Sequence, residues 1–371
     1  MLINTNIVLV IPRKNSVYID EAYMLVKTLG LNIAKTYMVR KPNPNYYIPL
    51  HISRKIKELI DGEGIELVIL YDDVKPRQIV NLTKELNVEI WDRTRLILEI
   101  FSYHAGSMEA KLQIELARIR HELPLIREYI RQAKLKELPG FLGPGRYAID
   151  AYYKMLRTRE AIIRRRLREL KNRRIERIKS RREQGLLHIA LTGYTSAGKT
   201  TLFNTLTGES KPTGPEAFTT LHTKAKKIYV NGLNVIVSDT VGFIRDVPIE
   251  IIEAFHATLA EIAYSDIVVL ILDASDEDPE MIEKLDLSLN TLSRIGVSGK
   301  PLLIALNKID LIDSYDEVKR KVEIVENIAK QLYSNIKAIV PISALKNINI
   351  DLLRNEIWRI LKELNGKEYM F

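Results

Sequence analysis

A glycine-rich stretch from Gly193 to Thr201 constrains this chain more than any other part of it. It reads Gly-Tyr-Thr-Ser-Ala-Gly-Lys-Thr-Thr and contains the pattern G-x-x-x-x-G-K-[ST]. An apolar run at 187–191 precedes it and apolar residues follow it at helical spacing, so the segment is predicted to fold as a strand, a glycine loop and a helix. In this context the N–H groups of the loop and the positive end of the helix can surround a phosphate group.

We therefore expect a nucleotide phosphate in this loop rather than an accidental glycine turn. Lys199 supplies a mobile ammonium group, and the Thr200 hydroxyl is suited to bind Mg²⁺. The candidate phosphate-binding residues are Gly193, Tyr194, Thr195, Ser196, Ala197, Gly198, Lys199, Thr200 and Thr201. The loop alone does not choose the nucleotide.

A D-x-x-G motif follows the next predicted strand, at Asp239 to Gly242. Asp239 can hold the shell of a Mg²⁺ ion through water, and the Gly242 N–H can reach a γ-phosphate. The motif is short and occurs often by chance, so its weight comes from its place after the phosphate loop.

Two further motifs point to the base. Asn307, Lys308 and Asp310 form an N-K-x-D motif after the apolar run 302–306. The Asp310 carboxylate can accept hydrogen bonds from the N1–H and the exocyclic amine of guanine, while Asn307 braces the base at N7. Adenine has an acceptor where guanine has N1–H, so a carboxylate there repels it.

The last motif is Ser343, Ala344 and Leu345, which follows a predicted strand at 338–342. Its backbone can contact the guanine O6. Together, in this order, the four motifs predict a guanine-nucleotide site.

Length and composition limit the remaining possibilities. A chain of 371 residues exceeds the usual single core, so two or three domains are expected. It contains no cysteine, which excludes disulfides, thiolate catalysis and cysteine-ligated zinc. It has no uncharged apolar run of about 18 residues and no signal-peptide pattern at residues 1–5, so we expect a cytoplasmic protein that does not enter a membrane.

The region 1–92 alternates short apolar runs with amphipathic stretches, which predicts a small and mostly parallel α/β sheet. Strands are expected at 7–11, 34–39, 67–71 and 88–91, and helices at 19–29, 52–60 and 77–86. No catalytic constellation is visible in this domain.

The region 93–184 has apolar residues at intervals of three and four on both sides of a glycine and proline break at 139–145. The pattern predicts one long helix before the break, with a bend at Gly106 or Pro124, and a second helix after it. Two long helices joined by such a loop favour an antiparallel hairpin.

The second arm of this hairpin is strongly basic. Between Arg157 and Arg182 there are thirteen Lys and Arg against three Glu, while the whole chain has a net charge of +9, so the remainder is close to neutral. The candidate RNA-binding residues are Arg164, Arg165, Arg166, Arg173 and Arg174. Few acidic residues stand four positions away to offset them, so we favour structured RNA, bound through backbone and shape, over a merely solvated face.

With these features in hand, the chain resembles the HflX family, GTPases of the translation-factor class. The residues that carry the resemblance are the segments 92–101 and 109–117, together with Asp239-Thr240-Val241-Gly242-Phe243-Ile244. The resemblance covers almost the whole chain. It implies an α/β protein with a Ras-like P-loop GTPase domain at 185–371, GTP and GDP as ligands, and association with the large ribosomal subunit and its ribosomal RNA. We expect a monomer.

The expected hydrolysis relies on positioning and charge neutralisation by Lys199, Thr220 and Gly242, with Mg²⁺ held by Thr200 and Thr220 and by Asp239 through water. Thr219 is the alternate for Thr220. Phe243 stands where Ras-type enzymes have a water-orienting Gln, so slow intrinsic hydrolysis is expected. Arg245, His256 or a ribosomal group would then order the water.

The chain departs from the family pattern at several places. Ser196 replaces a common Asn, which leaves stimulation by potassium open. Arg146 follows Gly143-Pro144-Gly145 where the family usually has Glu-Thr-Gln, and His222 begins a segment where the family tends to have Asp-Pro-Thr. We expect no counterpart of the further C-terminal domain that some relatives carry.

Two other function classes remain open from the sequence. One is an NTP-dependent factor that remodels nucleic acid, with the hairpin as a motor arm. The other is a GTP-regulated scaffold whose basic hairpin binds an acidic protein.

Overall fold

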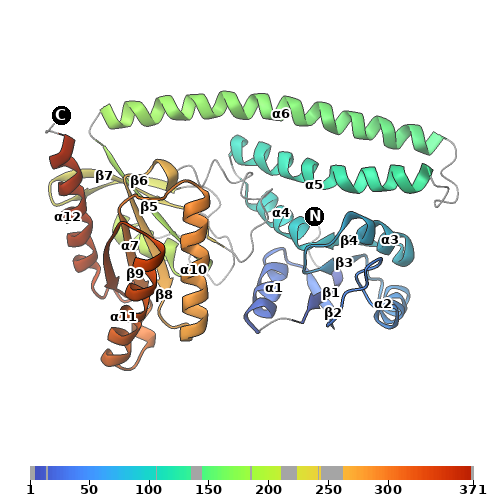
Figure 1. The fold of residues 1–371 in the computed structure, drawn as a ribbon, viewed down its shortest axis with the longest axis horizontal. Coiled ribbons are helices and arrows are strands. Elements are labelled where there is room, and N and C mark those ends of the chain that lie inside the picture. The colour runs from blue at the N-terminus through green and yellow to red at the C-terminus, as the bar shows by residue number, and fades with distance from the viewer. Residues whose placement is uncertain are drawn as a thin grey trace. The chain divides into compact units, whose positions relative to one another are not determined.

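The computed structural model divides the chain into two compact units, one built from the described residues up to Glu169 and the other from those from Leu170 onward. Each unit is considered by itself (Figure 1). The structure describes residues 5–13, 16–105, 107–134, 144–183, 186–209, 224–240, 242–243 and 262–368. The predicted division into three domains, at 92/93 and 184/185, stays a prediction.

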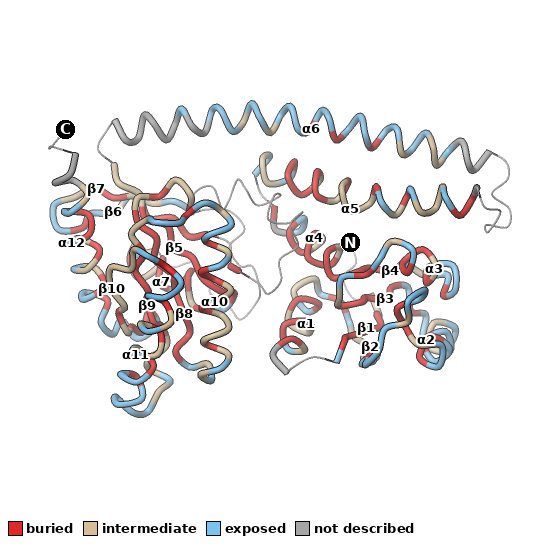
Figure 2. Tube along the Cα trace, viewed as in Figure 1, coloured by how far each residue is buried: buried red, intermediate tan, exposed pale blue. Residues whose placement is uncertain are grey.

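Within its described residues, the first unit contains a parallel sheet of order β2-β1-β3-β4. Its strands are β1 (Asn6–Pro12), β2 (Asn32–Val39), β3 (Leu67–Leu70) and β4 (Glu89–Asp92). Its first helices are α1 (Ser16–Thr28), α2 (Leu50–Glu63) and α3 (Pro76–Leu86). β3, and β1 from Ile7 onward, are apolar because both of their faces are covered, and Figure 2 shows these strands as buried. The expected strands and helices are confirmed to within a few residues.

The predicted long helix after β4 is in fact two helices, α4 (Arg93–His104) and α5 (Met108–Lys134). The backbone of Ala105 is extended, and the Ser107 hydroxyl accepts a hydrogen bond from the Ala110 N–H at 3.1 Å, which caps the start of α5. Gly106 lies outside the described residues. Pro124 lies inside α5 and does not end it.

The antiparallel hairpin is confirmed by α5 and α6 (Pro144–Glu183). Three of the side-chain pairs that join them show the direction, because the residue numbers in the two helices run in opposite directions. The pairs are Arg127 with Tyr153 at 3.0 Å, Glu122 with Tyr152 at 2.9 Å, and Glu115 with Arg159 at 2.6 Å. The predicted break at 139–145 lies outside the described residues up to 143, and α6 begins at Pro144.

The described part of the second unit contains a sheet of order β10-β9-β8-β5-β7-β6, in which only the β6 and β7 pair is antiparallel. Its strands are β5 (Leu187–Gly193), β6 (Lys224–Val230), β7 (Leu233–Asp239), β8 (Ile267–Asp273), β9 (Leu302–Asn307) and β10 (Ile336–Pro341). Its helices include α7 (Lys199–Thr207), α10 (Asp278–Arg294), α11 (Tyr315–Leu332), α12 (Ile350–Glu368) and the 3-10 turn η1 (Ile309–Leu311). Because β5, β7, β9 and β10 run parallel, the loops that follow them lie at the same edge of the sheet. The expected α/β architecture with a P-loop domain is confirmed.

None of the helices described above, α6 included, has the length of apolar sequence that a bilayer crossing requires.

A buried polar cluster closes the carboxyl edge of the first sheet. Arg93, only 2% exposed, donates to the Glu21 carboxylate at 3.1 Å, and the Tyr71 hydroxyl donates to the same oxygen at 2.6 Å. The Arg93 guanidinium also lies 5.3 Å from the centre of the Tyr71 ring. Burial and the Glu21 charge raise the pKa of Tyr71 well above its ordinary value, so the hydroxyl keeps the proton that it donates.

We predict that Glu21→Gln lowers the free energy of unfolding of the first unit by about 3 kcal/mol, because it leaves the Arg93 charge buried without its carboxylate. Urea denaturation followed by Trp91 fluorescence in a Trp358→Phe background reports on this unit, since the chain has two tryptophans. The double variant Glu21→Leu/Arg93→Met is expected to recover much of the loss. A change within about 0.5 kcal/mol for Glu21→Gln would contradict the prediction.

Candidate nucleotide-binding site

The phosphate loop lies between β5 and α7, and two of its glycines are required by close contacts. Gly193 has a φ of 144°, and a Cβ there would lie 2.2 Å from the carbonyl oxygen of Ile271 in β8. Gly198 has a φ of 95°, and a Cβ there would lie 2.3 Å from the Asn307 side-chain nitrogen. Both positions therefore exclude a side chain, which brings the loop against β8 and the end of β9.

Lys199, the first residue of α7, lies deep in the site. Lys199 is only 7% exposed. Its ammonium group donates a hydrogen bond to the Tyr194 carbonyl oxygen at 2.7 Å. A Cβ on Gly242 would lie 2.9 Å from the same nitrogen, so Lys199 and Gly242 lie close together. Burial lowers the pKa of Lys199 to about 8, against a smaller raising effect of the Asp239 carboxylate.

Thr200 and Asp239 also come together. Asp239 ends β7, which pairs with β5, and its side chain is fully buried. The Thr200 hydroxyl donates to the Asp239 carboxylate at 3.0 Å. A hydroxyl and a carboxylate oxygen at this distance are ligands of the kind that Mg²⁺ takes.

The segment after Asp239 is joined to the phosphate loop through the main chain. The Thr195 N–H donates to the Phe243 carbonyl oxygen at 2.8 Å, and the Phe243 N–H donates to the Gly193 carbonyl oxygen at 2.9 Å. Phe243 is 4% exposed. Its side chain therefore faces the interior, and its backbone extends the sheet edge by one bridge with Tyr194.

Asn307 connects three of the motifs. Its Nδ2 donates to the Ala197 carbonyl oxygen at 2.9 Å, and its Oδ1 accepts from the Ala344 N–H at 2.9 Å. Sequence reasoning gave this side chain only a contact with the base and missed its role as a brace between the phosphate loop and the Ser343 to Leu345 loop. The contact with the base stays a prediction.

The other residues near the expected base differ in exposure. Lys308 adopts a φ of 67° and its ammonium lies 2.5 Å from the Asp273 carboxylate. Asp310, in η1, is partly exposed. Ser343 is fully buried, whereas Leu345 is 73% exposed.

Lys284 of α10 supports the phosphate loop and was not found from the sequence. Its ammonium lies 5.4 Å from the centre of the Tyr194 ring, 2.7 Å from Asp276 and 2.8 Å from Glu280. Although burial lowers the pKa of Lys284, the hydrogen bonds with both carboxylates outweigh it and raise that pKa. Only the i,i+4 spacing of Glu280 and Lys284 was visible as a signal in the sequence.

Several predicted residues of the site lie outside the described residues, namely Thr219, Thr220, His222, Arg245 and His256. Ser196 is exposed and has a φ of 62°. Thr201 lies in the first turn of α7, partly exposed.

The expectation that the hairpin arginines have few acidic partners is wrong for two of them. Arg164 lies 2.6 Å from Glu160, which is buried, and Arg165 lies 3.6 Å from Glu169. Both pairs are spaced i,i+4, where helical side chains meet. Of the other three candidates, Arg166 and Arg173 are exposed, and the side chain of Arg174 is outside the described part.

We predict that Lys199→Met stabilises the nucleotide-free second unit at pH 7. An unfolded lysine titrates near 10.4 and Lys199 near 8, so between these values the unfolded state binds more protons and stability rises with pH. Below pH 8 the buried charge costs on the order of 3 kcal/mol. Urea denaturation from pH 7 to 10.5, without nucleotide and with EDTA, should show a more stable variant with a flatter pH profile. A variant less stable than the parent at pH 7 would contradict this.

We also predict that Lys284→Met weakens guanine-nucleotide binding by about 10-fold, because the Tyr194 ring loses its cation. Lys284→Arg keeps the charge and should bind within about 2-fold of the parent. Titration with a fluorescent GDP analogue measures both, and thermal melting checks that each variant is folded. Equal affinity of the Met variant would show that Lys284 does not position the loop.

Comparison with known proteins points to GTPases, as the site geometry does. The sequence profile described as a 50S ribosome-binding GTPase matches residues 188–308, and the profiles for the N-terminal and middle regions of GTP-binding GTPases match 16–102 and 104–181. The GTPase HflX of Hyperthermus butylicus is 48% identical over 365 residues, covering 97% of this chain and 96% of the relative. The GTPase HflX of Escherichia coli is 31% identical, covering 80% and 70%.

Solved structures agree as well. The crystal structure of SsGBP with GDP is 36% identical, with a TM-score of 0.59, and covers 97% of this chain and 99% of that one. A GTP-binding protein from Sulfolobus solfataricus in complex with GDP is 35% identical, with a TM-score of 0.55 and coverages of 97% and 99%. With the phosphate loop, the Asn307 brace and these relatives, the chain belongs to the HflX family of GTPases.

Proposed function

We propose that this chain is a GTP-binding and GTP-hydrolysing switch that associates with the large ribosomal subunit through ribosomal RNA. The observation that supports a guanine nucleotide is the Asn307 side chain, which holds the phosphate loop and Ala344 together with hydrogen bonds of 2.9 Å. Asp310 stands three residues on, partly exposed, where its carboxylate would accept from the N1–H and amine of guanine.

Mg²⁺ is the cofactor that we propose for this site. The Thr200 hydroxyl would supply a hard oxygen ligand, and the Asp239 carboxylate, 3.0 Å from it, would hold the ion through water. Among the described residues, no group of three or more His, Asp or Glu could hold a metal without other ligands. This suits an ion that takes most of its ligands from phosphate and water. When bound, Mg²⁺ would neutralise charge on the transferring phosphate, and Thr220 is our candidate for its second protein ligand.

Slow intrinsic hydrolysis is part of the proposal. Lys199 and the Gly242 N–H would neutralise and orient the γ-phosphate, with Thr220. Phe243 offers no side-chain hydrogen bond to water and is buried. A group from outside these residues, supplied by the ribosome in our proposal, would then order the attacking water.

The ribosomal partner is supported by the profile description, a 50S ribosome-binding GTPase, and by the exposed arginines of α6. The Arg165 side chain is 80% exposed despite its pairing with Glu169. Phosphates of ribosomal RNA would relieve the repulsion among these like charges. We propose that the chain acts as a monomer in the cytoplasm.

The test is co-sedimentation with large ribosomal subunits across a salt series, with a GTP analogue and with GDP. We expect tight, salt-dependent binding with the GTP analogue and weaker binding with GDP. A plot of log affinity against log salt has a negative slope, and Arg165→Gln/Arg166→Gln should make that slope shallower by about 1 to 2. The matched control, Lys319→Gln/Lys330→Gln on exposed positions of α11, should leave the slope unchanged.

Each other outcome counts against a stated part. Equal binding in both nucleotide states would contradict the switch and favour a scaffold. A slope that both double variants lower alike would contradict a contact through α6.

A further inference from the structure

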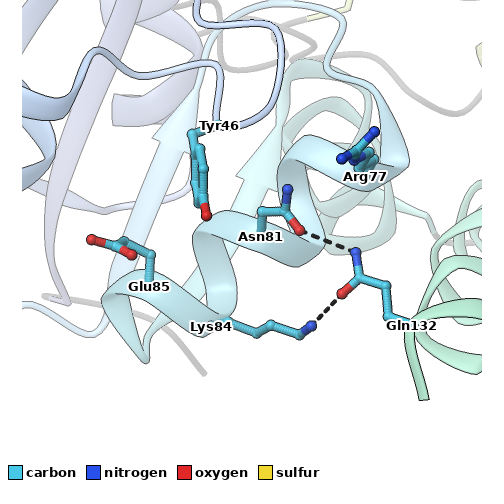
Figure 3. Close-up of a pocket in the computed structure, with 6 residues that line it drawn as sticks. All are labelled: Tyr46, Arg77, Asn81, Lys84, Glu85 and Gln132. Carbon is cyan, nitrogen blue, oxygen red and sulfur yellow. Dashed lines mark hydrogen bonds between the residues drawn. The ribbon is translucent and has the colours of Figure 1, made fainter. Parts of the chain in front are cut away.

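A polar pocket lies in the first unit between α3, α5 and the turn that carries Tyr46 (Figure 3). Its volume of about 330 Å³ falls at the lower end of the range of ligand sites, about 300 to 1,000 Å³. It is lined by Tyr46, Arg77, Asn81, Lys84, Glu85 and Gln132. The nucleotide site uses none of these residues.

The turn at 43–47 is fixed, yet it leaves an aromatic ring uncovered. The side-chain amides of Gln78 and Asn81 donate to main-chain carbonyl oxygens of the turn, at 2.8 and 3.0 Å. Asn43 and Tyr47 exchange two main-chain hydrogen bonds of 2.8 Å across it. Tyr46 nevertheless remains 40% exposed. The backbone that carries the ring is therefore held before any ligand arrives, which reduces the entropy cost of binding.

Hydrogen-bond donors outnumber acceptors in the pocket. The Gln132 amide nitrogen donates hydrogen bonds to Asn81 and Glu128, at 3.0 and 2.9 Å. Its amide oxygen accepts one from Lys84. Among the described residues, two N–H groups of Lys84 and one of Asn81 have no hydrogen-bond acceptor.

The charges of the lining residues point the same way. The Arg77 side chain forms no hydrogen bond within the described part of the chain, and it stands one helical turn before Asn81 on the exposed face of α3. Glu85 is the acidic residue of the lining, and Figure 3 shows its carboxylate pointing away from Arg77 and Gln132. An anionic ligand rich in acceptors fits this arrangement.

We propose that this pocket binds one unpaired nucleotide of an RNA strand, with the base stacked on Tyr46 and the phosphate held by Arg77 and Lys84. The proposal rests on the proposed association with ribosomal RNA and names a second contact for it. An aromatic ring beside cations is how proteins bind single strands, because every base has a face that stacks. An acidic peptide would use the cations but would leave the fixed ring without a role.

The experiment is fluorescence anisotropy of the full-length chain with GDP and a labelled ten-nucleotide RNA that cannot pair with itself. Tyr46→Ala should weaken binding by about 10-fold, and Tyr46→Phe should stay within about 2-fold, because it keeps the stacking face. Arg77→Gln/Lys84→Gln should weaken binding and lower the salt slope by about 1. The control Tyr315→Ala removes a tyrosine that is 82% exposed in the second unit and should have no effect.

The alternatives give different results. Parental affinity of a folded Tyr46→Ala variant would overturn the proposal. So would displacement of the RNA by free UMP or AMP at concentrations near those of the RNA, which would indicate a mononucleotide site, or stronger competition by polyglutamate than by unlabelled RNA. Failure of the unaltered chain to bind large subunits would remove the proposed function instead, and that measurement is made without the RNA strand.

Discussion

The nucleotide-binding edge of the second sheet depends on one side-chain amide, that of Asn307. Asn307 is 2% exposed, and its side chain has one donor end and one acceptor end, each matched by a main-chain group of a different loop. Parallel pairing already brings the strand ends to one edge, but it leaves the loops beyond them without a fixed spacing. The Asn307 amide sets that spacing, and Gly198 must lack a side chain because the amide nitrogen occupies the place that a Cβ would take. An aspartate would present an oxygen to a carbonyl oxygen there, so a carboxylate of the same shape could not replace it.

In the first unit, the corresponding edge of the sheet is occupied by protein side chains. Open α/β sheets bind ligands outside the carboxyl ends of their strands, where the strand order reverses. In the order β2-β1-β3-β4 that position lies between β1 and β3, and here Tyr71 follows β3 with its hydroxyl on Glu21, beside Arg93. The edge is filled by the protein's own side chains.

Sequence patterns predicted most of the fold because burial follows local periods. The strands and helices of the first sheet lie within a few residues of their expected places, as do β5, β7, β9 and β10 of the second sheet. No strand was expected at β6 or β8. The error at 105–107 has a physical cause, because the apolar stripe of α4 continues in register into α5 and hides the break. In the sequence only Gly106 and the Ser107 cap mark it, and a single glycine and a single serine are weak signals of a helix end.

The site was predictable where its residues belong to recognisable motifs. The spacing from Gly193 to Thr200 predicts a site that contains Lys199 and the threonine hydroxyl, because both follow from one turn of helix after a glycine loop, and the motif after the next strand adds Asp239 and Gly242. Contacts across the fold, such as Lys284 with the Tyr194 ring, depend on how α10 packs, and no spacing along the chain encodes them. The same holds for the Glu160 carboxylate, which meets Arg120 of the other hairpin arm as well as Arg164 of its own.

The bridge between Tyr194 and Phe243 consists of main-chain groups, and this separates two properties that a side chain would combine. Any residue with an N–H at position 243 would keep the phosphate loop tied to the segment that follows Asp239. The buried side chain at 243 serves packing instead. The connection between the two segments and the packing beneath them can therefore change independently.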